Sequence, residues 1–233
     1  MSTQDHERPD PFADMSVPKA LGYIGLQALS FTAIGLALWV LADRKRLDFV
    51  TLSGAEALSG LVLAAVLIAI SVVLAKAFPR YAEWLIRTQA RNYGFLRHRI
   101  SIGAIVFISL CAGIGEEALF RGGLQTVLGD WLPMPVALTL ASALFAAIHF
   151  AKPLNSALIF VIGCLFGLVY WRTGSLLTVM IGHAVYDIYA LWALQEALHK
   201  LGVFEEDKSP THLPAHAPRE TLEIREDTKG ESP

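Results

Sequence analysis

Three groups of ionisable residues interrupt apolar stretches of this 233-residue chain: Glu116, Glu117 and Arg121; His149; and His183 with Asp187. A charged side chain is costly in hydrocarbon, so residues of this kind in a membrane segment usually mark a functional site. A carboxylate can activate water, and an imidazole can stabilise an oxyanion or protonate a leaving amine. Together the residue types predict the hydrolysis of an amide bond.

The first group contains two acids with different surroundings. On a helix, Glu117 and Arg121 share a face because they are four residues apart, whereas Glu116 points about 100° away from Glu117. We predict that Arg121 keeps Glu117 ionised while Glu116 faces a cavity and acts as a general base. The alternative is an ion pair that only locks helices together, but this accounts for one of the two acids.

The two histidines lie in other apolar runs. His149 follows Phe145 by one helical turn, so the phenyl ring can pack beneath the imidazole; taken alone, such a histidine is also typical of a simple hydrogen bond between helices. His183 and Asp187 are four residues apart, so the carboxylate can reach the imidazole and fix its tautomer. Since three separate spans carry such groups, we predict that they converge in one polar pocket.

The composition indicates a membrane protein. The chain is 54% hydrophobic and 17% charged, with a mean hydropathy of +0.49, which is too apolar for a soluble domain of this length. The net charge is −2, and the basic residues form no continuous stripe, so nucleic acid is excluded as a partner. Cys111 and Cys164 lie in apolar segments, which predicts two buried thiols and no disulfide framework.

Six predominantly apolar runs predict an all-α, polytopic membrane protein with about six transmembrane helices. They lie at 20–42, 57–75, 100–132, 135–151, 158–171 and 176–194. Between the second and third spans, residues 76–99 carry Arg80, Glu83, Arg87 and Arg91 at helical spacing, which predicts an amphipathic helix at the membrane interface.

The chain therefore divides into four predicted regions. Residues 1–19 form a polar N-terminal tail, 20–99 hold two transmembrane helices and the interfacial helix, 100–200 form a catalytic helical core, and 201–233 form a disordered tail. Basic residues are more frequent in the loops on the side of the termini, which predicts cytoplasmic termini. We expect an integral protein of the plasma (inner) membrane of a bacterium.

The three groups resemble the motifs of a known family. The segment Glu116-Glu117-Ala-Leu-Phe-Arg121 resembles EExxxR, Phe145 to His149 resembles FxxxH, and His183 to Asp187 resembles HxxxN/D. These are motifs of the CAAX-protease and bacteriocin-processing family (CPBP or Abi), which includes the Ras-converting CAAX prenyl endopeptidase. The resemblance covers about residues 100 to 195.

The resemblance implies an all-helical membrane fold and intramembrane proteolysis. It implies that Glu116 activates water and that His149 and His183 stabilise the oxyanion or carry protons. Asp187 then supports the third motif, where the prenyl-protease members carry Asn, and Glu117 and Arg121 form a supporting pair. The implied substrate is a hydrophobic peptide or a lipidated protein in the lipid bilayer.

Members of this family are described both as metalloproteases and as glutamate-dependent enzymes. Two histidines and a carboxylate suit Zn²⁺, so Glu116, His149 and His183 would be the ligands of a divalent metal such as zinc. However, the chain contains no HExxH motif, and Arg121 beside the acids disfavours a cation. We therefore predict a glutamate mechanism that requires no cofactor.

Other classes of protein remain alternatives at this stage. The same acid and histidines can form the relay of a proton-coupled transporter, although no internal repeat is evident. A non-catalytic immunity or scaffold protein can retain such a pocket. Gly113-Ile-Gly115-Glu116 and Tyr186-Asp187 resemble the GxGD and YD elements of intramembrane aspartyl proteases, but their order is reversed and one acid is Glu. The GxSG string of rhomboid proteases is absent.

Overall fold

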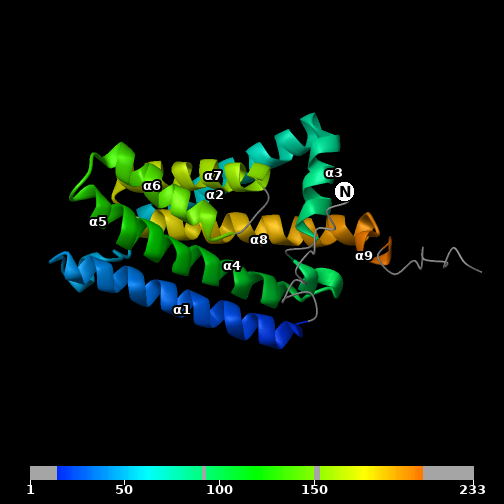
Figure 1. The fold of residues 1–233 in the computed structure, drawn as a ribbon, viewed down its shortest axis with the longest axis horizontal. Coiled ribbons are helices and arrows are strands. Elements are labelled where there is room, and N and C mark those ends of the chain that lie inside the picture. The colour runs from blue at the N-terminus through cyan, green and yellow to red at the C-terminus, as the bar shows by residue number, and fades with distance from the viewer. Residues whose placement is uncertain (1–14, 91–92, 150–152, 207–233) are drawn as a thin grey trace, which may run out of the picture.

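The computed structural model describes residues 15–90, 93–149 and 153–206, and helices are the only regular elements in these ranges (Figure 1). Within the described ranges, five helices are long and apolar enough to cross a membrane. They are α1 (Val17–Leu41), α2 (Gly54–Ala77), the helix that begins with α4 and runs from 102 to 129, α7 (Pro153–Thr173) and α8 (Leu176–Lys200). The predicted all-α polytopic membrane fold is confirmed.

The third span is one continuous helix with a change of winding in the middle. It consists of α4 (Ile102–Glu117), a π-helical segment η3 (Ala118–Gln125) and α5 (Thr126–Gly129). The prediction that the helix continues past Arg121 is thus confirmed. A π-helical turn often marks a functional site, and here it starts directly after the two glutamates.

The predicted fourth span is shorter than expected. Helix α6 runs over Met134–Ala147, which is 14 residues or about 21 Å, less than the roughly 30 Å of a bilayer core. The chain turns at Ile148 and His149, and α7 then begins at Pro153, where a proline is favoured at a helix N-terminus. His149 therefore lies at the end of a short apolar helix.

The remaining elements lie between or after the spans. They are η1 (Arg46–Asp48), α3 (Pro79–Gln89), η2 (Gly94–Arg97) and α9 (Val203–Glu206). Helix α3 runs across the ends of the spanning helices (Figure 1), as expected for an interfacial helix, and its Arg87 and Glu83 form an ion pair at 3.0 Å. Arg91 lies outside the described residues.

The two predicted tails lie mostly outside the described residues. Of the N-terminal tail, 1–14 are not described, and α1 already begins at Val17. Of the predicted disordered region 201–233, residues 201–206 form a turn and α9, and 207–233 are not described. The predicted boundary at 201 therefore falls just before a last short helix.

Small residues let the helices approach closely around the third span. That span packs against α1 and α8, while α8 also packs against α2, and α6 packs against α7 and η3. A Cβ atom added at Gly113 would lie 2.8 Å from the Cβ of Ala184 on α8. Without a hydrophobic force between helices in lipid, such backbone contacts stabilise the bundle, and they fix how α4 faces α8.

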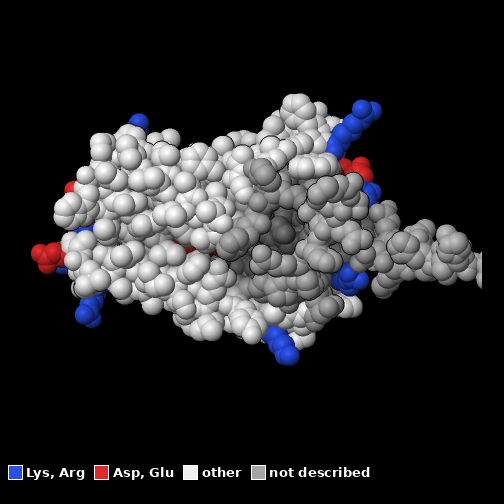
Figure 2. Space-filling view, in the orientation of Figure 1, with Lys and Arg blue, Asp and Glu red and all other residues white. Residues whose placement is uncertain are grey.

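The charged residues gather at the two ends of the molecule, with a broad uncharged band between them (Figure 2). A small acidic area is visible in a depression within this band (Figure 2). Large apolar side chains such as Leu29 and Val73 are exposed along the spans, as expected for surfaces that face lipid.

We predict that Gly35→Ala destabilises the protein, whereas Gly22→Ala on the same helix does not. A Cβ at Gly35 would lie 2.1 Å from the carbonyl oxygen of Ala118, while nothing lies within 4 Å of a Cβ at Gly22. Forcing α1 away from η3 should cost about 1–3 kcal/mol or more. Unfolding of the purified variants in increasing SDS measures this, and equal stability of the two variants would contradict the packing described.

Candidate active site

Glu117 lies at the centre of a buried polar cluster. Its side chain is fully buried, and its Oε1 accepts a hydrogen bond from Nδ1 of His183 at 2.8 Å. Its Oε2 lies 3.2 Å from Nε of Arg121, so the predicted ion pair is observed. One carboxylate thus connects α4, the π-helical segment and α8.

Arg121 holds this carboxylate from η3 and is itself fixed by α7. Its side chain is 1% exposed, and one terminal nitrogen donates to the carbonyl oxygen of Gly163 at 2.8 Å. The guanidinium also lies over the ring of Phe145, 4.7 Å from its centroid. A buried charge is tolerated when it is paired and hydrogen-bonded, and Arg121 meets both conditions.

Gln125, which the sequence pattern did not predict as a site residue, repeats the same contact one turn later. Its side-chain nitrogen donates to the carbonyl oxygen of Gly167 at 2.9 Å. Residues 121 and 125 are four apart, as are Gly163 and Gly167, so two polar side chains of η3 bond to successive turns of α7. A polar residue one turn after Arg121 in an apolar run was the available signal.

The Nε2 edge of the His183 ring faces two further carboxylates. The nitrogen lies 3.4 Å from Oδ2 of Asp187 and 3.9 Å from Oε2 of Glu116. The predicted proximity of Asp187 to His183 is therefore observed, but the contact at Nδ1, which sets the tautomer, comes from Glu117. The reason is that Glu117 reaches the ring across the α4 and α8 interface, which spacing within one helix does not reveal.

The cluster has a fully buried part and a partly exposed part. The side chains of Glu116 and Asp187 are 15% and 31% exposed, compared with 0% for Glu117. Phe166 of α7 stacks on the His183 ring with a centroid distance of 4.9 Å and covers another side of the imidazole. Glu116 is therefore the glutamate that water or substrate can reach, as its helical position predicted.

His149 joins the cluster through Phe145. Its Nδ1 lies 2.7 Å from the carbonyl oxygen of Phe145, and the centroids of the two rings are 4.7 Å apart. The Phe145 ring also lies edge-on to the ring of His183, with their centroids 6.3 Å apart. The structure thus brings all six predicted site residues into one cluster.

Tyr93 approaches this cluster from the segment that precedes η2. Burial raises the pKa of its hydroxyl, and the negative charges of Asp187 and Glu116 raise it further. The phenol therefore remains a neutral group that can donate a hydrogen bond near these carboxylates. Nothing in the sequence pattern of the amphipathic segment indicated this placement.

The predicted metal ligands do not form a metal site as they lie here. Within the ranges that the structure describes, no three His, Cys, Asp or Glu side chains are grouped so that they can hold one ion. The contacts of Glu117 with Arg121 and His183 balance its buried negative charge without a metal ion. The part of the chain that the structure describes thus shows no ready-made set of ligands for the zinc considered from the sequence.

The fold and the cluster define a helical membrane protein with a buried glutamate and histidine site. Residues 98–189 match the family described as type II CAAX prenyl endopeptidase Rce1-like. The resemblance predicted from the three motifs is confirmed over this segment, which contains all six predicted site residues.

One relative extends this finding. YpbD, an uncharacterised protein of Bacillus subtilis (strain 168), is 40% identical over 99 residues, which is 41% of this chain. The match covers 47% of that protein, so the chain spans about half the length of the curated relative. No solved structure matches the chain significantly.

We predict that Glu117→Gln destabilises the protein much more than Glu116→Gln. Replacing Glu117 leaves the buried charge of Arg121 without its counterion, which should cost about 3–5 kcal/mol. Glu116 is partly exposed, so its replacement should cost less than about 1 kcal/mol. Unfolding of both variants in SDS compares them, and a larger loss for Glu116→Gln would contradict the assignment of Glu117 as the buried member.

Proposed function

We propose that the protein is an intramembrane endopeptidase that hydrolyses a peptide bond of a membrane-associated or lipidated substrate. The similarity of residues 98–189 to the Rce1-like endopeptidases supports a protease of the CAAX type. The observation that carries the proposal is the approach of the partly exposed Glu116 to Nε2 of His183, at 3.9 Å, inside a bundle of apolar helices.

Glu116 is the general base in this proposal. Its carboxylate takes a proton from a water molecule, and the resulting hydroxide attacks the carbonyl carbon of the substrate. Glu117 cannot serve this purpose because both of its oxygens contact buried partners, His183 and Arg121. The adjacent acids therefore have separate tasks.

His183 and His149 stabilise the oxyanion and move protons. The bond from Nδ1 of His183 to Glu117 fixes the ring so that Nε2 is directed toward the accessible side, where a proton on it can stabilise negative charge. The carbonyl of Phe145 likewise contacts Nδ1 of His149, so Nε2 is the ring nitrogen that we assign to proton transfer. With a proton on Nε2, His149 can protonate the leaving amine.

Asp187 acts as a positioning residue at the open side of the site. It lies on the same face of α8 as His183 and within 3.4 Å of Nε2, so it can hold a proton on that nitrogen between catalytic steps. Arg121 and Gln125 stabilise the buried part of the site, since both donate hydrogen bonds to backbone carbonyl oxygens of α7.

The substrate is proposed from the surroundings of the site. The cluster lies among apolar helices in the uncharged band of the surface (Figure 2), so a substrate must reach it from within or beside the bilayer. A hydrophobic peptide end or a lipidated protein meets this requirement. We place the termini in the cytoplasm of a bacterium, by the positive-inside rule.

The geometry also favours an enzyme over the proton-coupled transporter. A relay across a bilayer needs titratable groups at several depths, whereas the six residues form one cluster connected by contacts of side chains. A non-catalytic immunity or scaffold protein makes a different prediction, because its phenotype would survive the loss of Glu116.

We predict that Glu116→Gln and His183→Ala abolish cleavage of a peptide library that contains lipidated peptides. Loss of a general base typically lowers the rate by about 10²–10⁴-fold. Glu83→Gln on α3 is the matched control, because it removes an exposed carboxylate of the same type far from the cluster. Full activity of Glu116→Gln in a folded sample would contradict the proposed mechanism.

We also predict that cleavage does not depend on a metal. Purified protein should contain much less than one zinc per chain by elemental analysis, and a chelator should leave its activity unchanged, because Glu116 itself activates the water. Inactivation by the chelator that is reversed by added zinc would show instead that a metal is required.

A further inference from the structure

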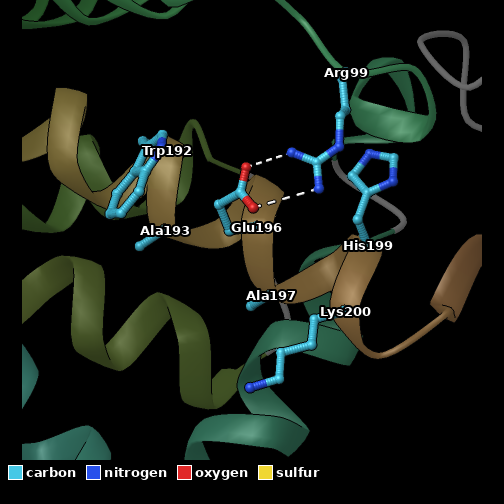
Figure 3. A pocket seen from close by; sticks show the side chains of 7 residues that line it. All are labelled: Arg99, Trp192, Ala193, Glu196, Ala197, His199 and Lys200. Carbon is cyan, nitrogen blue, oxygen red and sulfur yellow. Dashed lines mark hydrogen bonds and ion pairs between the residues drawn. The ribbon is translucent and has the colours of Figure 1, made fainter.

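A separate pocket lies at the end of α8, away from the cluster described above. It has a volume of about 560 Å³ and is lined by Arg99, Trp192, Ala193, Glu196, Ala197, His199 and Lys200 (Figure 3). Its residues lie on a different face of α8 from His183. The proposed proteolysis uses none of them.

One of the two cations of this pocket, Arg99, is held in place by the fold. Arg99 forms a two-pronged ion pair with Glu196, as Figure 3 shows. The next residue, Ile100, donates its backbone N–H to the side chain of the buried Gln195 at 2.8 Å. His199 is fixed by a contact of 3.0 Å between its Nε2 and the carbonyl oxygen of Leu96. The side chains of Arg99, Glu196 and His199 are therefore positioned before any ligand binds.

The polarity of the pocket changes in one direction along α8. Lys200 and His199 lie at the end of the helix, and Glu196 with its partner Arg99 follows (Figure 3). Trp192 lies farthest from this end, and 47% of its surface is exposed. Trp192 and Lys200 are eight residues apart, or about 12 Å along the helix axis. A charged end toward water and an aromatic ring toward hydrocarbon match the order of groups in a phospholipid.

The charge of the pocket and of its end of the bundle favours an anionic ligand. Two cations, Arg99 and Lys200, and one carboxylate, Glu196, line the pocket. Among the described residues, the end of the bundle with α3, η2 and α9 has seven Lys and Arg against four Asp and Glu, whereas the opposite end has four of each. Basic pockets of this kind at a membrane surface bind anionic headgroups.

We propose that this pocket binds the headgroup of an anionic phospholipid, with the phosphate between Arg99 and Lys200 and an acyl chain against Trp192. A soluble phosphate would use the cations but not the exposed indole, so the apolar end of the pocket favours a lipid. The bound lipid would fix the end of α8 in the leaflet beside α3. This binding does not depend on the proposed proteolysis.

The experiment uses the fluorescence of Trp192 in vesicles of phosphatidylcholine. Brominated phosphatidylglycerol or brominated phosphatidylcholine is added as quencher, each at the same small fraction of the lipid. The chain has five tryptophans, so the fluorescence of Trp192→Phe is subtracted to obtain the signal of Trp192 alone. One net cation at a membrane surface should give about a fivefold preference for the anionic quencher. Equal quenching by both lipids would overturn the proposal.

Two variants distinguish a specific lipid site in this pocket from a general attraction of the protein to an anionic membrane surface. Lys200→Gln should remove the preference, because it takes one of two cations from the pocket without breaking the pair of Arg99 and Glu196. Lys45→Gln, an exposed lysine at the opposite end of the bundle, is the control and should retain it. A preference that survives Lys200→Gln would overturn the proposal.

A soluble competitor distinguishes the source of the phosphate. Excess glycerol 3-phosphate should leave the quenching by brominated phosphatidylglycerol unchanged, because it lacks acyl chains that contact Trp192. Displacement of the lipid by this compound would show a site for soluble phosphates and contradict the assignment of a lipid. Because the measurement needs no turnover, its result is independent of whether the protein cleaves peptides.

Discussion

The structure depends on the requirement that every charge buried among apolar helices has a partner. Glu117 meets this requirement for three elements at once, because its carboxylate accepts a hydrogen bond from His183 on α8 and pairs with Arg121 on η3. An isolated ionised group in such surroundings would cost far more than the few kcal/mol by which proteins are stable. The position of the His183 ring, and with it the geometry of the whole cluster, follows from this carboxylate.

The same requirement explains why glycines surround the site. Arg121 and Gln125 reach the carbonyl oxygens of Gly163 and Gly167, and a Cβ at Gly167 would lie 2.8 Å from the Gln125 side chain. The close contact of η3 with α7 therefore supplies acceptors that the buried guanidinium and amide need. The result is a cluster with a rigid, fully buried half and a half that water can enter, which includes Glu116.

The sequence predicted the contacts that helical spacing determines. The pairs Glu117 with Arg121, and His183 with Asp187, are four residues apart, and helix geometry alone brings them together. The bond between Glu117 and His183 was not predictable, because it depends on how α4 faces α8, which the contact of Gly113 with Ala184 sets. The early end of α6 was missed because residues 148–151 are as apolar as the helix before them, apart from His149.

The most direct test of this account is a double-mutant cycle between Glu117 and His183. The free energy of unfolding in SDS is measured for Glu117→Gln, for His183→Gln and for the variant with both changes. If the buried hydrogen bond fixes the ring, the two changes should deviate from additivity by about 0.5–3 kcal/mol. Additive effects would show that the two side chains do not interact, and would contradict the claim that Glu117 organises the site.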